Sequence, residues 1–165
     1  MKYNFKYSGI NYNDFSAAPG ICLTVFTQGC PHRCPGCHNP ETWDFDGGQE
    51  LTEEVVDSII NGITAQGITR NLCIMGGEPL CEENSLLTYT IIEAVKLLCP
   101  KDVKIYIWTG YTIEELLESK HTYVIESLRS ADFLIDGPYV EAERDITLSM
   151  RGSRNQRILD LSNYF

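Results

Sequence analysis

The chain has 165 residues, of which 43% are hydrophobic and 22% charged, a composition ordinary for a soluble globular protein with one continuous core. Its net charge of −10 argues against general nucleic-acid binding, which needs a basic face for the phosphates. No apolar run approaches the roughly 20 residues that span a bilayer, and the N-terminus lacks the apolar core of a secretion signal. We therefore expect a single cytoplasmic domain over residues 1–165, with no membrane partner.

Strand-like and helix-like segments alternate along the chain. The segments that are short, apolar and rich in β-branched residues predict strands over 21–27, 71–75, 103–108, 132–135 and 156–161. Apolar residues at helical spacing predict helices over 52–65, 85–98, 112–119 and 123–128. Thr52 is the expected N-cap of the first helix, and Thr112 with Glu115 the expected capping box of the third.

Helices placed between strands imply a parallel sheet with right-handed crossovers. The strands are too few for a closed eight-stranded barrel, which typically takes about 250 residues. We therefore expect an α/β fold in a single domain: an open partial (β/α) barrel with mostly parallel strands, or else a doubly wound sheet.

Three of the seven cysteines are clustered. Cys30, Cys34 and Cys37 have the spacing C-x3-C-x2-C and directly follow the strand expected at 21–27. An odd number of cysteines without a secretion signal makes a poor disulfide framework, whereas clustered cysteines in a reducing compartment more often bind metal. Three thiolates on one loop can bind three irons of a [4Fe–4S] cluster and leave the fourth iron open. The scattered cysteines receive no role: Cys22, Cys73, Cys81 and Cys99.

Three other interpretations fit the same spacing. The segment C-P-G-C-H at 34–38 matches a c-type haem attachment pattern, although nothing exports this chain and the first cysteine would be unused. A structural zinc site would need His32 or His38 as its fourth ligand. A ferredoxin-like electron carrier would need Cys73 or Cys81 close by. We favour the open cluster, but spacing alone does not exclude these alternatives.

Glycine motifs follow the other expected strands. They are Gly76–Gly77–Glu78–Pro79, Thr109–Gly110–Tyr111 and Asp136–Gly137–Pro138. In parallel α/β folds the carboxyl ends of the strands meet at the edge where ligands bind. We therefore expect the site at this edge, together with the cysteine loop.

The cysteine spacing followed by GGEP resembles the radical S-adenosylmethionine superfamily and, within it, the activating enzymes of anaerobic ribonucleoside-triphosphate reductase. The resemblance runs nearly end to end, through GCPHRCPGCHNPETW (29–43), GGEPL (76–80), WTGYTIEEL (108–116), LIDGPY (134–139) and RGSRNQR (151–157). Many members of the superfamily have an aromatic residue before the third cysteine, where this chain has Gly36. We interpret this glycine as a mark of the subfamily.

The resemblance implies a role for each matching residue. Cys30, Cys34 and Cys37 would bind the [4Fe–4S] cluster, whose fourth iron the amino and carboxylate groups of S-adenosylmethionine would chelate. The residues implied for the S-adenosylmethionine pocket are Gly36, Cys37, His38, Gly76, Gly77, Glu78 and Thr109. No role is implied for Asp136, Tyr139 or the arginines of 151–157.

The reaction implied by the resemblance is radical formation. The reduced cluster would cleave S-adenosylmethionine to a 5′-deoxyadenosyl radical, which would take a hydrogen from one glycine of the reductase and leave a glycyl radical. The expected partners are that reductase and an electron donor such as a flavodoxin. The alternatives are an activator of another glycyl-radical enzyme, such as pyruvate formate-lyase, and a non-catalytic iron–sulfur electron-transfer module.

Overall fold

Seven strands form one open sheet in the computed structural model, which describes residues 3–165. The strands lie in the order β3-β1-β2-β4-β5-β6-β7. Their bounds are β1 Lys6–Asp14, β2 Cys22–Thr27, β3 Gln49–Glu50, β4 Asn71–Gly76, β5 Ile105–Trp108, β6 Phe133–Asp136 and β7 Arg157–Asp160. The edge strands β3 and β7 do not pair with each other, so the sheet is not a closed barrel.

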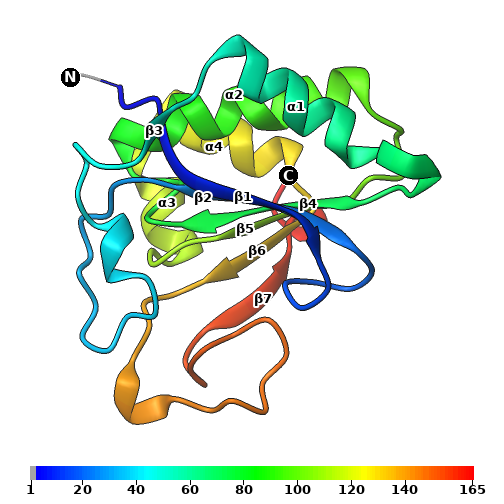
Figure 1. Cartoon of the computed structure of the whole chain (residues 1–165). Coiled ribbons are helices and arrows are strands. Elements are labelled where there is room, and N and C mark those ends of the chain that lie inside the picture. Colours follow the sequence, from blue (N-terminus) through cyan, green and yellow to red (C-terminus); the bar gives the residue numbers. More distant parts are fainter. Residues whose placement is uncertain (1–2) are drawn as a thin grey trace.

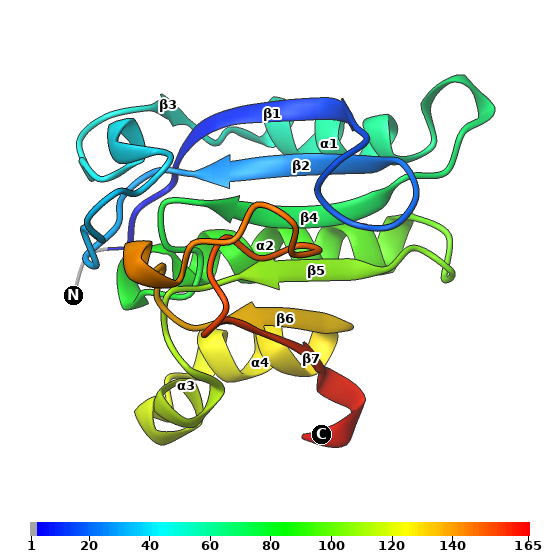
Figure 2. The same ribbon diagram turned by 90° about the horizontal axis from the view of Figure 1, so that it is seen from below.

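The four central strands are parallel. β2 pairs with β4, β4 with β5 and β5 with β6, all in parallel register, while β1, β3 and β7 are antiparallel to their neighbours. A helical crossover separates each central strand from the next, as parallel neighbours require. The carboxyl ends of the four strands therefore meet at one edge of the sheet, which is the left edge in Figure 2.

The helices gather on one face of the sheet. α1 (Glu53–Ile63), α2 (Glu82–Leu98) and α4 (Thr122–Ser130) cover this face, and α3 (Ile113–Ser119) follows β5 near the carboxyl ends of the strands (Figure 1). The opposite face is crossed by the segment 137–156, drawn in orange in Figure 2. A hydrogen bond from Nε1 of Trp108 to the carbonyl oxygen of Met150, at 2.8 Å, attaches this segment to β5.

The alternation of side chains along each strand divides the core between the two faces. Leu72 and Ile74 of β4 belong to the large cluster that packs against the helices, whereas Cys73 points into a smaller cluster on the other face. Partly buried Met75, Trp108 and Met150 pack against the smaller cluster. Burying both faces of the central strands explains why they read as continuous apolar runs.

Most elements match the sequence-based expectation. All five expected strands and all four expected helices form, with bounds within a few residues. The side chain of Thr52 accepts a hydrogen bond from the Val55 N–H, and the capping box of Thr112 and Glu115 is complete. Across residues 3–165, no helix combines the length and the apolar character needed to cross a membrane.

Two strands and one helical turn were not expected. β1 is antiparallel to its neighbours and contains Gly9 and several polar residues, and β3 has only two residues. Neither strand therefore gives a clear apolar pattern in the sequence. Helix α2 begins at Glu82 rather than Ser85. Its first turn, Glu-Glu-Asn, has no apolar residue, and the N-cap Cys81 makes no side-chain cap.

Candidate functional site: a cysteine loop against a Gly-Gly-Glu turn

The loop that carries the three cysteines is closed at its base by backbone hydrogen bonds. The Gly29 N–H donates to the carbonyl oxygen of Thr42 at 2.7 Å, and the Cys30 N–H donates to that of Trp43 at 3.1 Å. The buried amide of Gln28 donates to two further carbonyl oxygens of the returning segment, those of Glu41 and Asp44. These hydrogen bonds therefore hold the base of the loop in place at Cys30, the first cysteine.

A tight turn brings the second and third cysteines together. The Cys37 N–H donates to the carbonyl oxygen of Cys34 at 3.1 Å, across Pro35 and Gly36. Gly36 has φ +78°, as the third position of a type II turn requires. A Cβ at Gly36 would also lie 2.7 Å from the carboxyl carbon of Glu141. The positive φ explains physically why this chain has glycine before its third cysteine, whereas the exposed side chain of Glu141 could move aside.

The Gly-Gly-Glu turn lies directly against the start of the cysteine loop. The Gly77 N–H donates to the carbonyl oxygen of Thr27, and the Glu78 N–H to that of Gly29, both at 2.9 Å. A Cβ at Gly77 would stand 2.4 Å from the same Gly29 oxygen, and a Cβ at Gly76 would stand 2.7 Å from the Thr27 nitrogen. Both glycines are needed because the two backbones touch.

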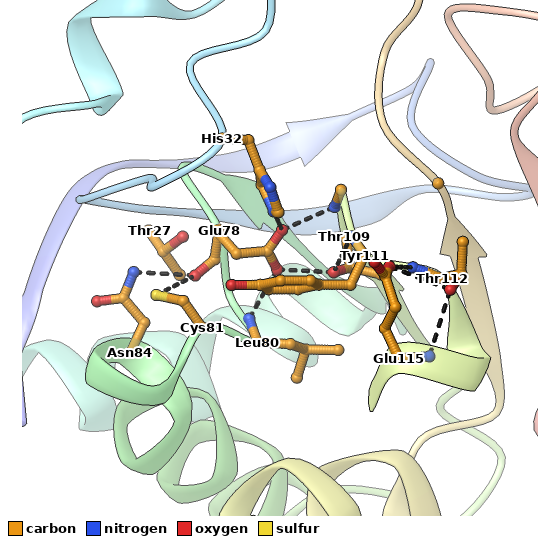
Figure 3. A network of polar contacts seen from close by, with 12 residues as sticks. Thr27, His32, Glu78, Leu80, Cys81, Asn84, Thr109, Tyr111, Thr112 and Glu115 are labelled. Carbon is orange, nitrogen blue, oxygen red and sulfur yellow. Dashed lines mark hydrogen bonds and ion pairs between the residues drawn. The ribbon is translucent and has the colours of Figure 1, made fainter. Parts of the chain in front are cut away.

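The carboxylate of Glu78 is buried, at 1% exposure, and lies at the centre of a polar network (Figure 3). Its Oε1 accepts hydrogen bonds from the Leu80 N–H at 2.9 Å and the Thr109 hydroxyl at 2.8 Å. Its Oε2 accepts one from the Gly110 N–H at 2.7 Å and lies 2.6 Å from Nε2 of His32. Four partners satisfy a charge that burial alone would make costly. The carboxylate thus joins the ends of β4 and β5 to the cysteine loop.

The electrostatics of the network follow from burial and this carboxylate. Burial lowers the pKa of His32, but its hydrogen bond to Glu78 and the charges of Glu78 and Glu115 outweigh burial and raise that pKa above its ordinary value. Burial, with the nearby charge of Glu78, raises the pKa of Cys30 to about 11. The ring of His32 also meets that of Tyr111 edge to face, with centroids 4.4 Å apart.

The three cysteines and the Gly-Gly-Glu turn line one cavity of about 210 Å³. Of the site residues predicted from the sequence, only Gly36 does not line this cavity; it shapes the turn between Cys34 and Cys37 instead. The residues that do line it are Cys30, Cys34, Cys37, His38, Gly76, Gly77, Glu78 and Thr109. Strand ends and a loop that are far apart in the sequence therefore line one cavity.

Several lining residues were not assigned a role from the sequence. Met75, Trp108 and Met150 give the cavity an apolar wall, and Tyr139 and Gln156 reach it from the segment 137–156. Gln156 holds this segment in place, because its Oε1 accepts the Gly152 and Ser153 N–H groups and its Nε2 donates to the carbonyl oxygen of Gly137. The alternation of β4 and β5 could have identified Met75 and Trp108, but no local signal marks Gln156.

Two residues that the sequence left without a role form an ion pair outside the cavity. Asp136, at 0% exposure, accepts the Ile113 N–H at 2.8 Å and hydrogen bonds from Arg157 at 2.9 and 2.5 Å. Arg157 also pairs with Glu114 on α3. This part of the RGSRNQR motif therefore ties β7 to β6 and α3.

The four scattered cysteines are not among the described residues that line the cavity. Sγ of Cys81 donates to the carbonyl oxygen of Glu78, and Sγ of Cys99 to that of Ile60. Cys22 and Cys73 are both fully buried in the smaller core cluster. Within residues 3–165, the cysteine donors that line the cavity are therefore the three of the loop.

Three thiols from one loop are a donor set that suits a [4Fe–4S] cluster. In the part of the chain that the structure describes, no three His, Cys, Asp or Glu side chains converge where one metal ion could bind. A cubane cluster takes each thiolate on a different iron, so its ligands surround the cluster instead of meeting at a point. A loop with three thiols around a cavity fits this requirement.

Comparison with known proteins agrees with the donor set. A protein family described as "4Fe-4S single cluster domain" matches residues 17–159. Fold, cysteine loop and this match together define the class: an α/β protein built around one [4Fe–4S] cluster.

The relatives narrow the class to one family. The chain is 37% identical over 146 residues to the anaerobic ribonucleoside-triphosphate reductase-activating protein of Vibrio cholerae, covering 88% of this chain and 91% of the relative. It is 36% identical over 145 residues to the protein of that name from Escherichia coli K12 (87% and 90% covered). It is 33% identical over 153 residues to that of Enterobacteria phage T4 (93% and 92%). The chain belongs to the family of anaerobic ribonucleoside-triphosphate reductase-activating proteins.

Proposed function

We propose that Cys30, Cys34 and Cys37 bind the [4Fe–4S] cluster and that S-adenosylmethionine occupies the adjoining cavity. One observation carries this proposal: the three thiols and the Gly-Gly-Glu turn line the same cavity. The pocket residues would be Cys37, His38, Gly76, Gly77, Glu78 and Thr109, with Gly36 shaping the turn beside them. We take residues 1–165 as one radical S-adenosylmethionine domain, an open partial barrel with its site at the carboxyl ends of the strands.

The protein is an activating enzyme for anaerobic ribonucleoside-triphosphate reductase, and that reductase is its partner. When bound, the cluster would supply the one electron that cleaves S-adenosylmethionine to methionine and a 5′-deoxyadenosyl radical. That radical would take a hydrogen atom from one glycine of the reductase, giving 5′-deoxyadenosine and a glycyl radical. We propose that the reaction takes place in the cytoplasm and that a small electron-transfer protein such as a flavodoxin reduces the cluster.

The residues of this chain hold and shield the reactants. Gly76 and Gly77 line the cavity without side chains, so their backbone can contact the amino acid part of the cofactor. The apolar wall of Met75, Trp108 and Met150 keeps water from that side of the cavity. The segment 137–156 completes the cavity from the open face of the sheet.

Electron paramagnetic resonance tests the proposal. The anaerobically reconstituted and reduced protein should give a [4Fe–4S] signal that changes when S-adenosylmethionine is added. A cluster indifferent to S-adenosylmethionine would instead support an electron-transfer module. Formation of a glycyl radical on the anaerobic reductase, but not on pyruvate formate-lyase, would establish the partner.

A pair of cysteine variants tests the ligand assignment. Cys34→Ala should abolish cluster binding, whereas Cys99→Ala should leave the iron content unchanged, because Cys99 contacts only the helix side of the core. Equal iron loss in both variants would contradict the assignment.

A further inference from the structure

Asn84 is a fully buried amide in the first turn of α2, at 0% exposure. Asparagine is a weak helix former, and burying an amide without partners costs free energy. Its position therefore needs an explanation in hydrogen bonds, and the contacts provide one.

The amide of Asn84 bridges the two loops that form the site, and Figure 3 shows its contact with Glu78. Its Nδ2 donates to the carbonyl oxygen of Gly29 at 3.0 Å and to that of Glu78 at 2.9 Å. Its Oδ1 accepts a hydrogen bond from Nδ2 of Asn4 at 3.1 Å. The same Asn4 nitrogen donates to the carbonyl oxygen of Gln28 at 2.9 Å. Two asparagine amides thus hold three backbone carbonyl groups next to the site.

These contacts differ from helix capping. A capping asparagine accepts hydrogen bonds from the free N–H groups of the first turn. The Asn84 amide nitrogen instead donates both of its hydrogens to carbonyl groups outside the helix. The amide of Asn84 therefore fixes the two loops in place, and helix α2 provides the position from which it does so.

The two carbonyl groups that Asn84 contacts belong to the two halves of the site, the cysteine loop and the Gly-Gly-Glu turn. Gly29 immediately precedes the first cysteine, and Glu78 ends the Gly-Gly-Glu turn. The Gly29 oxygen accepts from both the Asn84 amide and the Glu78 N–H, so both of its lone pairs are used. No other single side chain named in this network contacts both backbones.

We infer that Asn84 is a positioning residue that sets the distance between the cluster loop and the S-adenosylmethionine turn. The inference rests on the proposed function, since it presumes that the cluster and the cofactor occupy these two halves. Asn84 touches neither of them; it acts through the Gly29 and Glu78 carbonyl groups. Its loss should spare cluster ligation, which the cysteines perform, and should impair the fit of S-adenosylmethionine beside the cluster.

The test compares Asn84→Ala and Asn4→Ala in the reconstituted protein, with Ile92→Val as the control. Ile92 is fully buried on the same helix and belongs to the large core cluster, so its variant loses packing without touching either loop. The measurements are iron content, the dissociation constant for S-adenosylmethionine, and the change that S-adenosylmethionine causes in the electron paramagnetic resonance signal.

Asn84→Ala should retain its iron and bind S-adenosylmethionine about tenfold more weakly, as the loss of two hydrogen bonds to neutral carbonyl groups allows. The signal change on adding the cofactor should shrink or alter in shape. Asn4→Ala should weaken binding about two- to threefold, since it removes the outer contacts to Asn84 and Gln28 and leaves both bonds from Asn84 to the loops in place. Ile92→Val should lower the melting temperature without altering the dissociation constant.

Unchanged affinity and an unchanged signal in Asn84→Ala would overturn the inference. If Asn84→Ala takes up no cluster, the Asn4→Ala variant decides in the same way. The unmodified protein is measured alongside to separate the two proposals. If the unmodified protein does not respond to S-adenosylmethionine, the proposed function is refuted. If the unmodified protein and Asn84→Ala respond equally, only the positioning role is refuted.

Discussion

Nε2 of His32 lies 2.6 Å from Oε2 of Glu78, and this contact joins the cysteine loop to the end of β4. His32 stands between the first two cysteines, and Glu78 follows the two glycines of the turn. The pair is therefore a direct side-chain link between the residues proposed for the cluster and those proposed for its cofactor.

Replacing His32 by alanine should destabilise the protein. The variant leaves a buried carboxylate with three of its four partners, and an unmade hydrogen bond to a buried charge costs about 1–3 kcal/mol. Urea unfolding followed by circular dichroism measures this loss. His38→Ala is the matched control, because His38 is exposed and only its ring approaches that of Tyr139. Equal stability of the two variants would show that the His32 contact contributes nothing.

Replacing Gly77 by alanine should disturb the cysteine loop itself. The new Cβ would stand 2.4 Å from the carbonyl oxygen of Gly29, which is backbone and cannot rotate away. Gly29 precedes Cys30, so we expect lower iron content as well as weaker S-adenosylmethionine binding. Gly9→Ala is the control, since a Cβ at Gly9 meets nothing within 4 Å. Full iron content with Gly77→Ala would mean that the two backbones can separate freely.

The sequence indicated which residues would lie together, but not the contacts that hold them in place. The cysteine spacing and the GGEP motif are local patterns, and the alternation of strands and helices brings their positions to one edge. The resemblance placed Gly77 in the expected cofactor pocket, and the structure shows that this position also has to make room for the Gly29 carbonyl. That contact joins positions 48 residues apart, and no local pattern contains it.

The residues that the sequence could not assign act through backbone groups. Asn84 lies in a helical turn without apolar residues, and its partners are carbonyl oxygens, which every residue possesses. The same reason hides Gln156, whose partners are two N–H groups and one carbonyl. Side-chain contacts with backbone leave no complementary residue type in the sequence that would identify them.

Asp14 should make stability depend on pH. Burial would raise its pKa, but hydrogen bonds from Ser16, Thr24 and Ala17 outweigh burial and lower that pKa below its usual 3.8. The Thr24 hydroxyl donates at 2.7 Å from β2, so the carboxylate anchors the β1–β2 connection. A folded pKa below the unfolded one gives stability that is fully present above the unfolded pKa and is lost as pH falls through the folded pKa.

The variant Asp14→Asn isolates this contribution. The unmodified protein should be more stable than the variant at about pH 6, and the difference should shrink as the pH falls below about 4, where the carboxylate begins to gain protons. Urea unfolding of both proteins at each pH measures the difference in their free energy of unfolding. The contributions of the other titrating groups cancel in this difference. A difference that grows on acidification would mean that the pKa of Asp14 is raised in the folded protein.

The ion pair between Arg157 and Asp136 should be needed to keep β7 on the sheet. Asp136 is fully buried, and without Arg157 its carboxylate retains only the Ile113 N–H among its described hydrogen bonds. Removing one partner of a fully buried pair costs about 3–5 kcal/mol, but the Arg157 side chain is 43% exposed. Water can then reach the carboxylate, so we expect Arg157→Ala to cost about 2 kcal/mol in urea unfolding.

Two further variants test whether the loss of stability comes from the Arg157–Asp136 ion pair or from the loss of a positive charge in general. Arg154→Ala removes an equal charge from an exposed position three residues away and should leave stability nearly unchanged. The double variant Asp136→Asn/Arg157→Ala should be more stable than Arg157→Ala alone, because it no longer buries an unpaired carboxylate. If the double variant is instead the less stable of the two, Asp136 stabilises the fold through its Ile113 contact and not through the arginine.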